Sequence, residues 1–139
     1  MECTIKVYTE QQYDSHTDRE EKVFQGTLFK KNDQVYIIYK EEDQETGVKT
    51  TNQIKVSKDG RVSVRRMGPV QSILHFAKDK SYTTFYNTGR GMMELAFLPQ
   101  VVKYKAEPLA YEIELRYTIY MGESKLSENV YILKTVSLA

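Results

Sequence analysis

Residues 64–76 read V-R-R-M-G-P-V-Q-S-I-L-H-F, and residues 80–97 read K-S-Y-T-T-F-Y-N-T-G-R-G-M-M-E-L-A-F. Apolar and polar residues alternate through most of this stretch, which is typical of strands with one buried face. Gly68-Pro69 must interrupt or bend a strand, because proline has no amide hydrogen to donate to a ladder. Residues 87–91 hold two glycines and predict a longer turn. The stretch therefore predicts antiparallel strands joined by turns.

The same two-residue period continues along most of the chain. Asn32-Asp33 and Asp59-Gly60 are signals for tight hairpin turns, since these residues tolerate the left-handed region of backbone conformation. Residues 11–21 are polar, show no apolar stripe and predict a loop. After an interruption at Pro99-Gln100, residues 101–105 either continue a strand beyond a bulge or begin a new one. The expected strands are residues 4–10, 23–31, 35–40, 49–56, 61–67, 70–76, 82–86, 92–98, 109–121 and 130–138.

Consecutive strands with short connections leave two antiparallel solutions, a sandwich or a barrel. The near absence of long crossovers favours an all-β, antiparallel up-and-down barrel of about eight to ten strands. A closed barrel also removes exposed strand edges, which matters for strands as rich in tyrosine as these. The length of 139 residues indicates one domain, residues 1–139, that needs no disulfide or metal for stability.

Composition excludes several classes of function. The net charge is +1, so broad electrostatic capture of nucleic acid or of an anionic membrane is not expected. No apolar run is long enough to span a bilayer, and the N-terminus lacks the pattern of a signal peptide. The single cysteine, Cys3, cannot form an internal disulfide, and the simple interpretation is a cytoplasmic protein.

Four spaced motifs carry a resemblance to a known family. They are Y-I-I-Y-K-E-E at residues 36–42, T-T-N-Q-I-K-V at residues 50–56, R-R-M-G at residues 65–68 and F-Y-N-T-G-R-G-M-M-E-L at residues 85–95. With Y-E-I-E-L-R-Y and E-N-V-Y-I-L near the C-terminus, they stand in the same order as in the YwiB-like proteins. The chain resembles this family of uncharacterised bacterial cytoplasmic proteins, which is grouped with the calycins. The resemblance implies a lipocalin-like barrel and brings no established activity or catalytic residues.

Catalytic and metal-binding motifs are absent from the sequence. There is no G-x-S-x-G, P-loop, H-E-x-x-H or C-x-x-C pattern. With two histidines and one cysteine, His16, His75 and Cys3, the chain offers no set of ligands at a metal-binding spacing. We expect no metal, no cofactor and no catalytic residue, and the hypothesis of an enzyme would need a site that no motif reveals.

The tyrosines are the first candidates for a binding site. The chain has 11 tyrosines, 5 phenylalanines and no tryptophan. Tyrosine suits a half-wet cavity, because its ring can contact an apolar body while its hydroxyl orients it. Packing in the core or across strands is the alternative. The tyrosines that recur at strand parity are Tyr36, Tyr39, Tyr82, Tyr86, Tyr111 and Tyr117.

Four polar residues complete the candidate set. By strand parity, Arg66 points to the side of Val62 and Val64, where it either ends the core or enters the barrel mouth and binds a carboxylate or phosphate. Arg90 lies between two glycines and is either a solvated turn residue or part of an anion site. His75 lies on the face opposite Leu74 and contacts either solvent or a ligand. Glu94 needs a partner such as Arg66 if it faces inward.

Three hypotheses of function follow. The first is a barrel that binds a small, partly apolar ligand at its mouth, with tyrosines as walls and Arg66 or Arg90 as anchor. The second is a protein-interaction or scaffold module with a filled barrel, which could form a homodimer through a strand edge. The third is an enzyme with a set of Arg, Glu, His and Tyr residues in the barrel.

Overall fold

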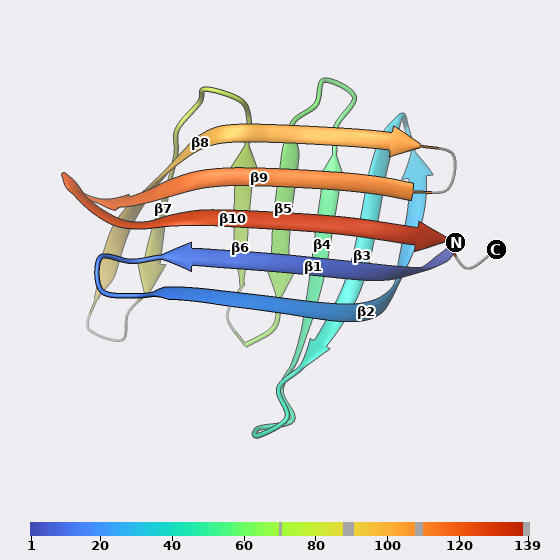
Figure 1. Cartoon of the computed structure of the whole chain (residues 1–139), viewed down its shortest axis with the longest axis horizontal. Coiled ribbons are helices and arrows are strands. Elements are labelled where there is room, and N and C mark those ends of the chain that lie inside the picture. Colours follow the sequence, from blue (N-terminus) through green and yellow to red (C-terminus); the bar gives the residue numbers. More distant parts are fainter. Residues whose placement is uncertain (70, 88–90, 108–109, 138–139) are drawn as a thin grey trace.

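The computed structural model describes residues 1–69, 71–87, 91–107 and 110–137, and every regular element in these ranges is a strand. The ten strands follow one another along the chain with short connections (Figure 1). They are β1 (Glu2–Gln12), β2 (Thr17–Lys31), β3 (Gln34–Glu42), β4 (Lys49–Val56), β5 (Val62–Met67), β6 (Ser72–Phe76), β7 (Tyr82–Asn87), β8 (Met92–Glu107), β9 (Ala110–Met121) and β10 (Ser124–Ser137). The predicted all-β class is confirmed.

All ten strands belong to one antiparallel sheet with the order β6-β5-β4-β3-β2-β1-β10-β9-β8-β7. Strands that are consecutive in sequence pair with each other, except β6 and β7, and the pairing of β1 with β10 joins the two parts of the meander. In Figure 1 strands β1, β2, β8, β9 and β10 form the near layer and β3–β7 the far layer. The predicted up-and-down, lipocalin-like barrel is therefore confirmed.

The barrel is nearly closed, whereas the sequence predicted full closure. β6 and β7 are the two ends of the strand order, and the described residues show one isolated bridge between these strands' ends, Ala77 with Lys80. We call the gap between β6 and β7 the seam. A tight turn joins the two strands, with Asp79 at a φ of 62°. Within the described residues, β6 and β7 form no ladder beyond this turn. Two edges consequently remain unpaired.

The inward face changes from apolar to polar along several strands. On β4 the inward residues are Val56, Ile54 and Asn52, and on β5 they are Val62, Val64 and Arg66. Buried apolar residues fill the middle of the barrel and the end where Val56 and Val62 lie. The polar residues Asn52 and Arg66 lie at the other end. The core consists of Cys3, Ile5, Val7, Leu28, Val35, Ile37, Tyr39, Ile54, Val56, Val62, Phe76, Tyr111, Ile113, Leu115 and Leu133.

The predicted loop over residues 11–21 is wrong. β1 continues to Gln12 and β2 begins at Thr17, so that the two strands pair out to Gln12–Thr17. The turn is short and is closed by a 2.8 Å hydrogen bond from the Tyr13 amide to the His16 carbonyl. This end of the hairpin is largely exposed, so its strands have no buried face to mark them in the sequence. Backbone pairing alone extends the ladder there.

Two interruptions of the strands match the sequence. β5 ends at Met67 and β6 begins at Ser72, which places Gly68-Pro69 between them as a strand break. β8 runs without a break through Pro99, and its register against β9 shifts between Pro99 and Val101. The bulge is thus the correct alternative for this segment.

Gly26 sets how closely β2 can approach its neighbours. A Cβ atom added there would collide with the Ile38 carbonyl oxygen and with Cδ1 of Ile5, and it would lie 3.3 Å from Cβ of Tyr39. We predict that Gly26→Ala lowers the free energy of unfolding by about 1–3 kcal/mol, the usual cost of overpacking. Chemical denaturation measures this change. Gln25→Ala, at the exposed neighbouring position, is the control, and equal stability of the two variants would contradict the prediction.

Candidate functional site

A cavity of about 360 Å³ opens at the polar end of the barrel. Strand register places most of its lining residues on the inward face, and we call it the mouth cavity. The strands supply a continuous wall on the side where β1 pairs with β10. The lining residues are Val7, Thr9, Glu10, Gln11, Glu20, Lys22, Phe24, Tyr39, Glu41, Asn52, Val64, Arg66, Leu74, Tyr117, Asn129, Val130 and Tyr131.

Aromatic rings form much of the inner wall. The Phe24 ring stacks on Tyr39, with centroids 4.7 Å apart. Tyr117 packs between Phe76 and Phe97, at centroid distances of 4.9 Å and 6.0 Å. Such contacts fix the rings, because aromatic pairs have preferred geometries beyond simple burial. The cavity therefore has a rigid, apolar inner wall.

Two tyrosine hydroxyls meet inside the cavity wall. The Tyr39 and Tyr131 oxygens lie 3.0 Å apart, and either can donate the hydrogen bond. Burial raises the pKa of Tyr39 to about 12, although the hydrogen bond from Tyr131 acts in the opposite direction. Burial also raises the pKa of Tyr131 well above its ordinary value, because its phenol end is enclosed even though part of the residue reaches the surface. Both phenols are consequently neutral at pH 7.

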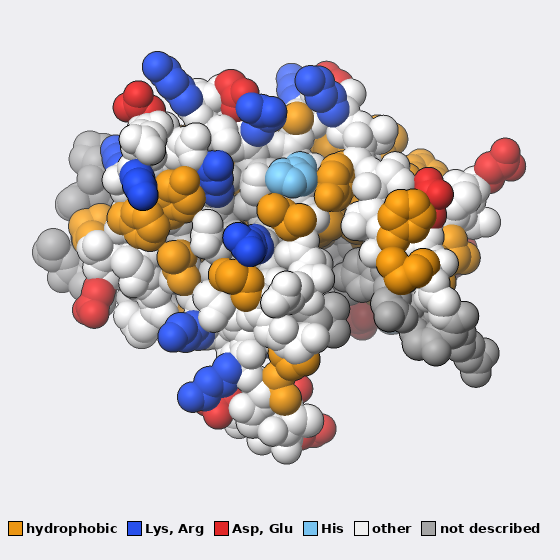
Figure 2. All heavy atoms as spheres, turned by 180° about the vertical axis from the view of Figure 1, so that it is seen from behind, with side chains coloured by type: hydrophobic (Ala, Val, Ile, Leu, Met, Phe, Trp, Pro, Cys, Tyr) orange, Lys and Arg blue, Asp and Glu red, His pale blue; other side chains and the backbone are white. Residues whose placement is uncertain are grey.

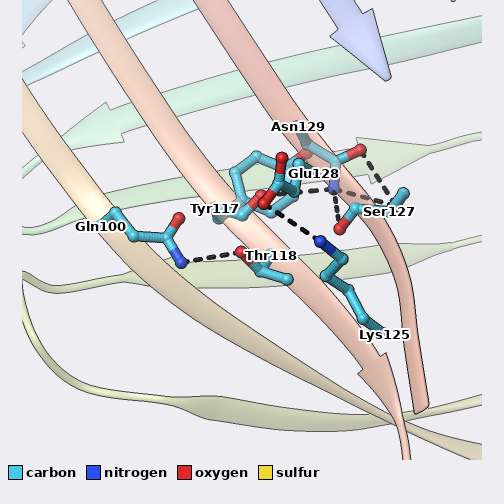
Figure 3. Close-up of polar contacts among 7 residues, drawn as sticks. All are labelled: Gln100, Tyr117, Thr118, Lys125, Ser127, Glu128 and Asn129. Carbon is cyan, nitrogen blue, oxygen red and sulfur yellow. Dashed lines mark hydrogen bonds and ion pairs between the residues drawn. The ribbon is translucent and has the colours of Figure 1, made fainter. Parts of the chain in front are cut away.

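The two buried amides of the cavity already have partners. Asn52 donates to Oε1 of Glu41 at 3.0 Å. Asn129 donates to Oγ of Ser127 at 3.0 Å and lies close to a register shift in β10 between Lys125 and Ser127. Figure 3 shows this cluster beside Tyr117, with the Gln100–Thr118 bond on the adjacent strands. These polar groups hold the rim in shape, since leaving them unpaired would be costly.

Charge at the rim is mostly paired. Lys22 lies 2.9 Å from Glu20, and Glu10 lies 3.4 Å from Arg19. Arg66 is exposed at the rim and, within the described residues, makes no hydrogen bond or ion pair. Its guanidinium is therefore the strong donor of this cavity that is free to meet a ligand.

The structure brings three of the predicted site residues to this cavity, namely Tyr39, Arg66 and Tyr117. Tyr111 faces inward, but it is buried in the core and stacks on Tyr104 at 5.9 Å. Tyr36 lies on the outer face, where its ring stacks on Phe29 at 4.9 Å. It does not contribute to the mouth cavity, because its strand parity is opposite to that of Tyr39.

The other predicted site residues lie elsewhere. His75 and Tyr82 form a T-shaped pair at 5.2 Å beside a different cavity. Glu94 is exposed and pairs with Phe85 on the outer face of β7 and β8, so it cannot meet Arg66 inside the barrel. Arg90 and the side chain of Tyr86 lie outside the described residues.

Several lining residues were not predicted from the sequence. Phe24, Asn52, Asn129 and Tyr131 all face the cavity. The strand period contained a signal for Asn52, which stands at the parity of Ile54 and Val56. Nothing in the pattern of a single strand could show that Tyr131 reaches Tyr39, because the two residues are 92 positions apart.

Among the described residues no group of three or more His, Cys, Asp or Glu side chains could hold a metal ion. Cys3 is buried, and burial raises the pKa of its thiol. None of the described segments forms a helix with the length and apolar character that crossing a membrane requires.

The fold places the chain in the class of lipocalin-like barrels, with ten strands nearly closed around an interior that is open at one end. Over residues 5–133 the sequence matches the family model described as "Domain of unknown function (DUF1934)", and the chain belongs to this family. It is similar to the crystal structure of the ywiB protein from Bacillus subtilis, with 22% identity and a TM-score of 0.83. The match covers 99% of this chain and 92% of that chain, and it confirms the predicted resemblance in fold. No curated protein matches the sequence.

The paired phenols predict a loss of stability at alkaline pH. A folded pKa above the unfolded value of about 10 means that stability is complete below pH 10 and is lost as the pH rises toward 12. For Tyr39 this change corresponds to roughly 2–3 kcal/mol. We expect the double variant Tyr39→Phe with Tyr131→Phe to lose less unfolding free energy between pH 9 and 12 than the wild type, as measured by urea denaturation.

Tyr13→Phe is the control for this comparison, since it removes a phenol at the β1–β2 turn. That variant should follow the wild-type pH dependence. Equal alkaline losses in the double variant and the wild type would contradict the assignment.

Proposed function

We propose that this chain is a non-enzymatic binding protein that holds a small, partly apolar monocarboxylate in the mouth cavity. The observation that carries the proposal is Arg66, a guanidinium without a protein partner among the described residues, at the rim of a cavity with an aromatic wall. A carboxylate can accept two parallel hydrogen bonds from such a group. The apolar part of the ligand would lie against Phe24, Val64 and Leu74.

The size and charge of the cavity narrow the ligand. A volume of about 360 Å³ lies at the lower end of the range for small-molecule sites. Three carboxylates, on Glu10, Glu20 and Glu41, and two cations, on Lys22 and Arg66, line it. This surplus of negative charge disfavours a polyanion, so the ligand that fits carries a single negative charge directed at Arg66.

Most polar side chains of the mouth cavity are already hydrogen-bonded or ion-paired, which favours binding over catalysis. Glu20 is paired with Lys22, and Glu41 accepts from Asn52, which leaves neither carboxylate poised as a general base. The hydroxyls of Tyr39 and Tyr131 are hydrogen-bonded to each other and remain neutral. We infer that these groups orient a ligand through hydrogen bonds.

The compartment proposed for this function is the bacterial cytoplasm. Support comes from Cys3, which is buried and unpaired, as is usual for proteins of a reducing compartment. A small organic acid with an apolar body is a ligand that such a compartment supplies.

Binding tests this function most directly. Native mass spectrometry of the purified protein should detect a retained small molecule, or isothermal titration with aryl and medium-chain monocarboxylates should give saturable binding. We expect Arg66→Gln to weaken binding about tenfold or more, as for the loss of a charge-assisted pair. Leu74→Trp should abolish it by filling the cavity.

Arg65→Gln is the matched control, because Arg65 is the neighbouring residue on the outer face of the same strand. This variant should bind as the wild type does. Equal weakening in the two arginine variants would contradict the proposed anchor. Absence of any monocarboxylate binding, together with a dimer in light scattering, would instead favour the scaffold module.

A further inference from the structure

A second cavity, of about 370 Å³, lies at the other end of β5 and β6, beside the turn that borders the seam. Val62 and Phe76 pair with each other at that end of the two strands, whereas Arg66 pairs with Ser72 near the mouth. We call this space the seam cavity. It shares no lining residue with the mouth cavity. It is therefore a separate place where a ligand could bind.

The seam cavity is lined by cations without carboxylates. Lys55, Arg61 and Lys80 belong to its lining, and none of the lining residues identified in the described part of the chain is Asp or Glu. Nε of Arg61 lies 2.8 Å from Oδ2 of Asp59, a contact that restrains the side chain and offsets part of its charge. Lys80 makes no ion pair with any described residue. Positive charge is thus concentrated in a confined space.

The surface around the seam cavity also carries many positively charged side chains. Figure 2 shows the molecule from the side on which β3–β7 face the viewer. Lys and Arg side chains are spread across the middle of this face, whereas the visible carboxylates lie mostly near its outline. An anion that approaches this face meets attractive charges before it reaches the cavity.

Neutral donors and aromatic groups complete the lining. Oγ of Ser63 lies 3.2 Å from Nδ1 of His75. If Ser63 donates that bond, Nε2 of His75 carries the hydrogen and can donate to an anion. Tyr82 meets the His75 ring edge-on at 5.2 Å, and these two rings form the aromatic part of the lining. The cavity therefore combines an anion site with a surface for a compact apolar group.

We propose that the seam cavity binds a small phosphate monoester with a compact aromatic body. A phosphate dianion matches three cations better than a carboxylate does, and its three oxygens can accept from lysine, arginine and hydroxyl donors together. The aromatic body would lie against the rings of His75 and Tyr82. This site is independent of the proposed function of the mouth, which selects a single negative charge.

Phenyl phosphate is the probe, with phenol as the uncharged comparison. In ¹H–¹⁵N correlation spectra of the wild type, phenyl phosphate should shift the amides of Ser63, His75 and Tyr82 saturably, while the amides of Phe24 and Asn129 at the mouth move little. Phenol should bind at least tenfold more weakly. No saturable shift at millimolar phenyl phosphate, or equal binding of phenol, would overturn the proposal.

Charge variants test the anchors. The double variant Arg61→Gln with Lys80→Gln should raise the dissociation constant of phenyl phosphate by about tenfold or more. Lys78→Gln is the matched control, since Lys78 is an exposed cation in the same turn but outside the lining. It should change affinity less than twofold. Equal weakening by the control and the double variant would show non-specific attraction and overturn the site, and the wild-type spectra decide the question if the double variant does not fold.

Discussion

The pairing of the first strand with the last is the interaction on which the rest of the structure depends. β1 and β10 align from Cys3–Ser137 to Gln12–Glu128, and this ladder joins the six strands β1–β6 to the four strands β7–β10 in one sheet. Without it, the two parts would each expose an apolar face and an unpaired edge. The contact spans nearly the whole sequence, so it requires ordering a long loop of chain before it stabilises anything. Closure at the opposite side is incomplete, because β6 and β7 separate beyond their turn.

The inward-facing side chains change from apolar to polar along the barrel axis, so the two ends of the barrel differ in character. Ile5, Ile37, Ile54, Ile113 and Leu133 are fully buried and fill the middle of the interior. Toward the mouth the inward positions become polar, which leaves space that side chains do not fill. Toward the other end a cationic recess lies beside the turn that borders the seam. One meander thus carries an open interior and a separate surface cavity of different charge.

Much of the fold follows from local sequence. Strand periodicity, the turns at Asn32-Asp33 and Gly60, and the break at Gly68-Pro69 all predict what the structure shows. The strands of residues 11–21 could not be predicted, because their side chains are exposed and only backbone pairing holds them. The seam was also beyond prediction, since a tight turn such as that at Asp79 usually joins strands that pair.

The candidate site was predictable only in part. Parity placed Arg66 inward and His75 outward, because each depends on its own strand alone. The Tyr39–Tyr131 contact depends on how distant strands are arranged around the barrel, and it left no local signal. Tyr36 points outward because its strand parity is opposite to that of Tyr39. The abundance of tyrosine in the sequence therefore did not by itself identify which tyrosines line the mouth cavity.

Native-state hydrogen exchange tests most directly the account of a barrel joined by β1 and β10 and left open at the seam. The account predicts that amides in the middle of β1 and β10, such as those of Val7 and Leu133, exchange only by global unfolding. Amides of β6 and β7 that point to the seam should exchange faster by several orders of magnitude, because they lack ladder partners. Equal protection of both sets would contradict the account, since it would mean that β6 and β7 are hydrogen-bonded and the barrel is fully closed.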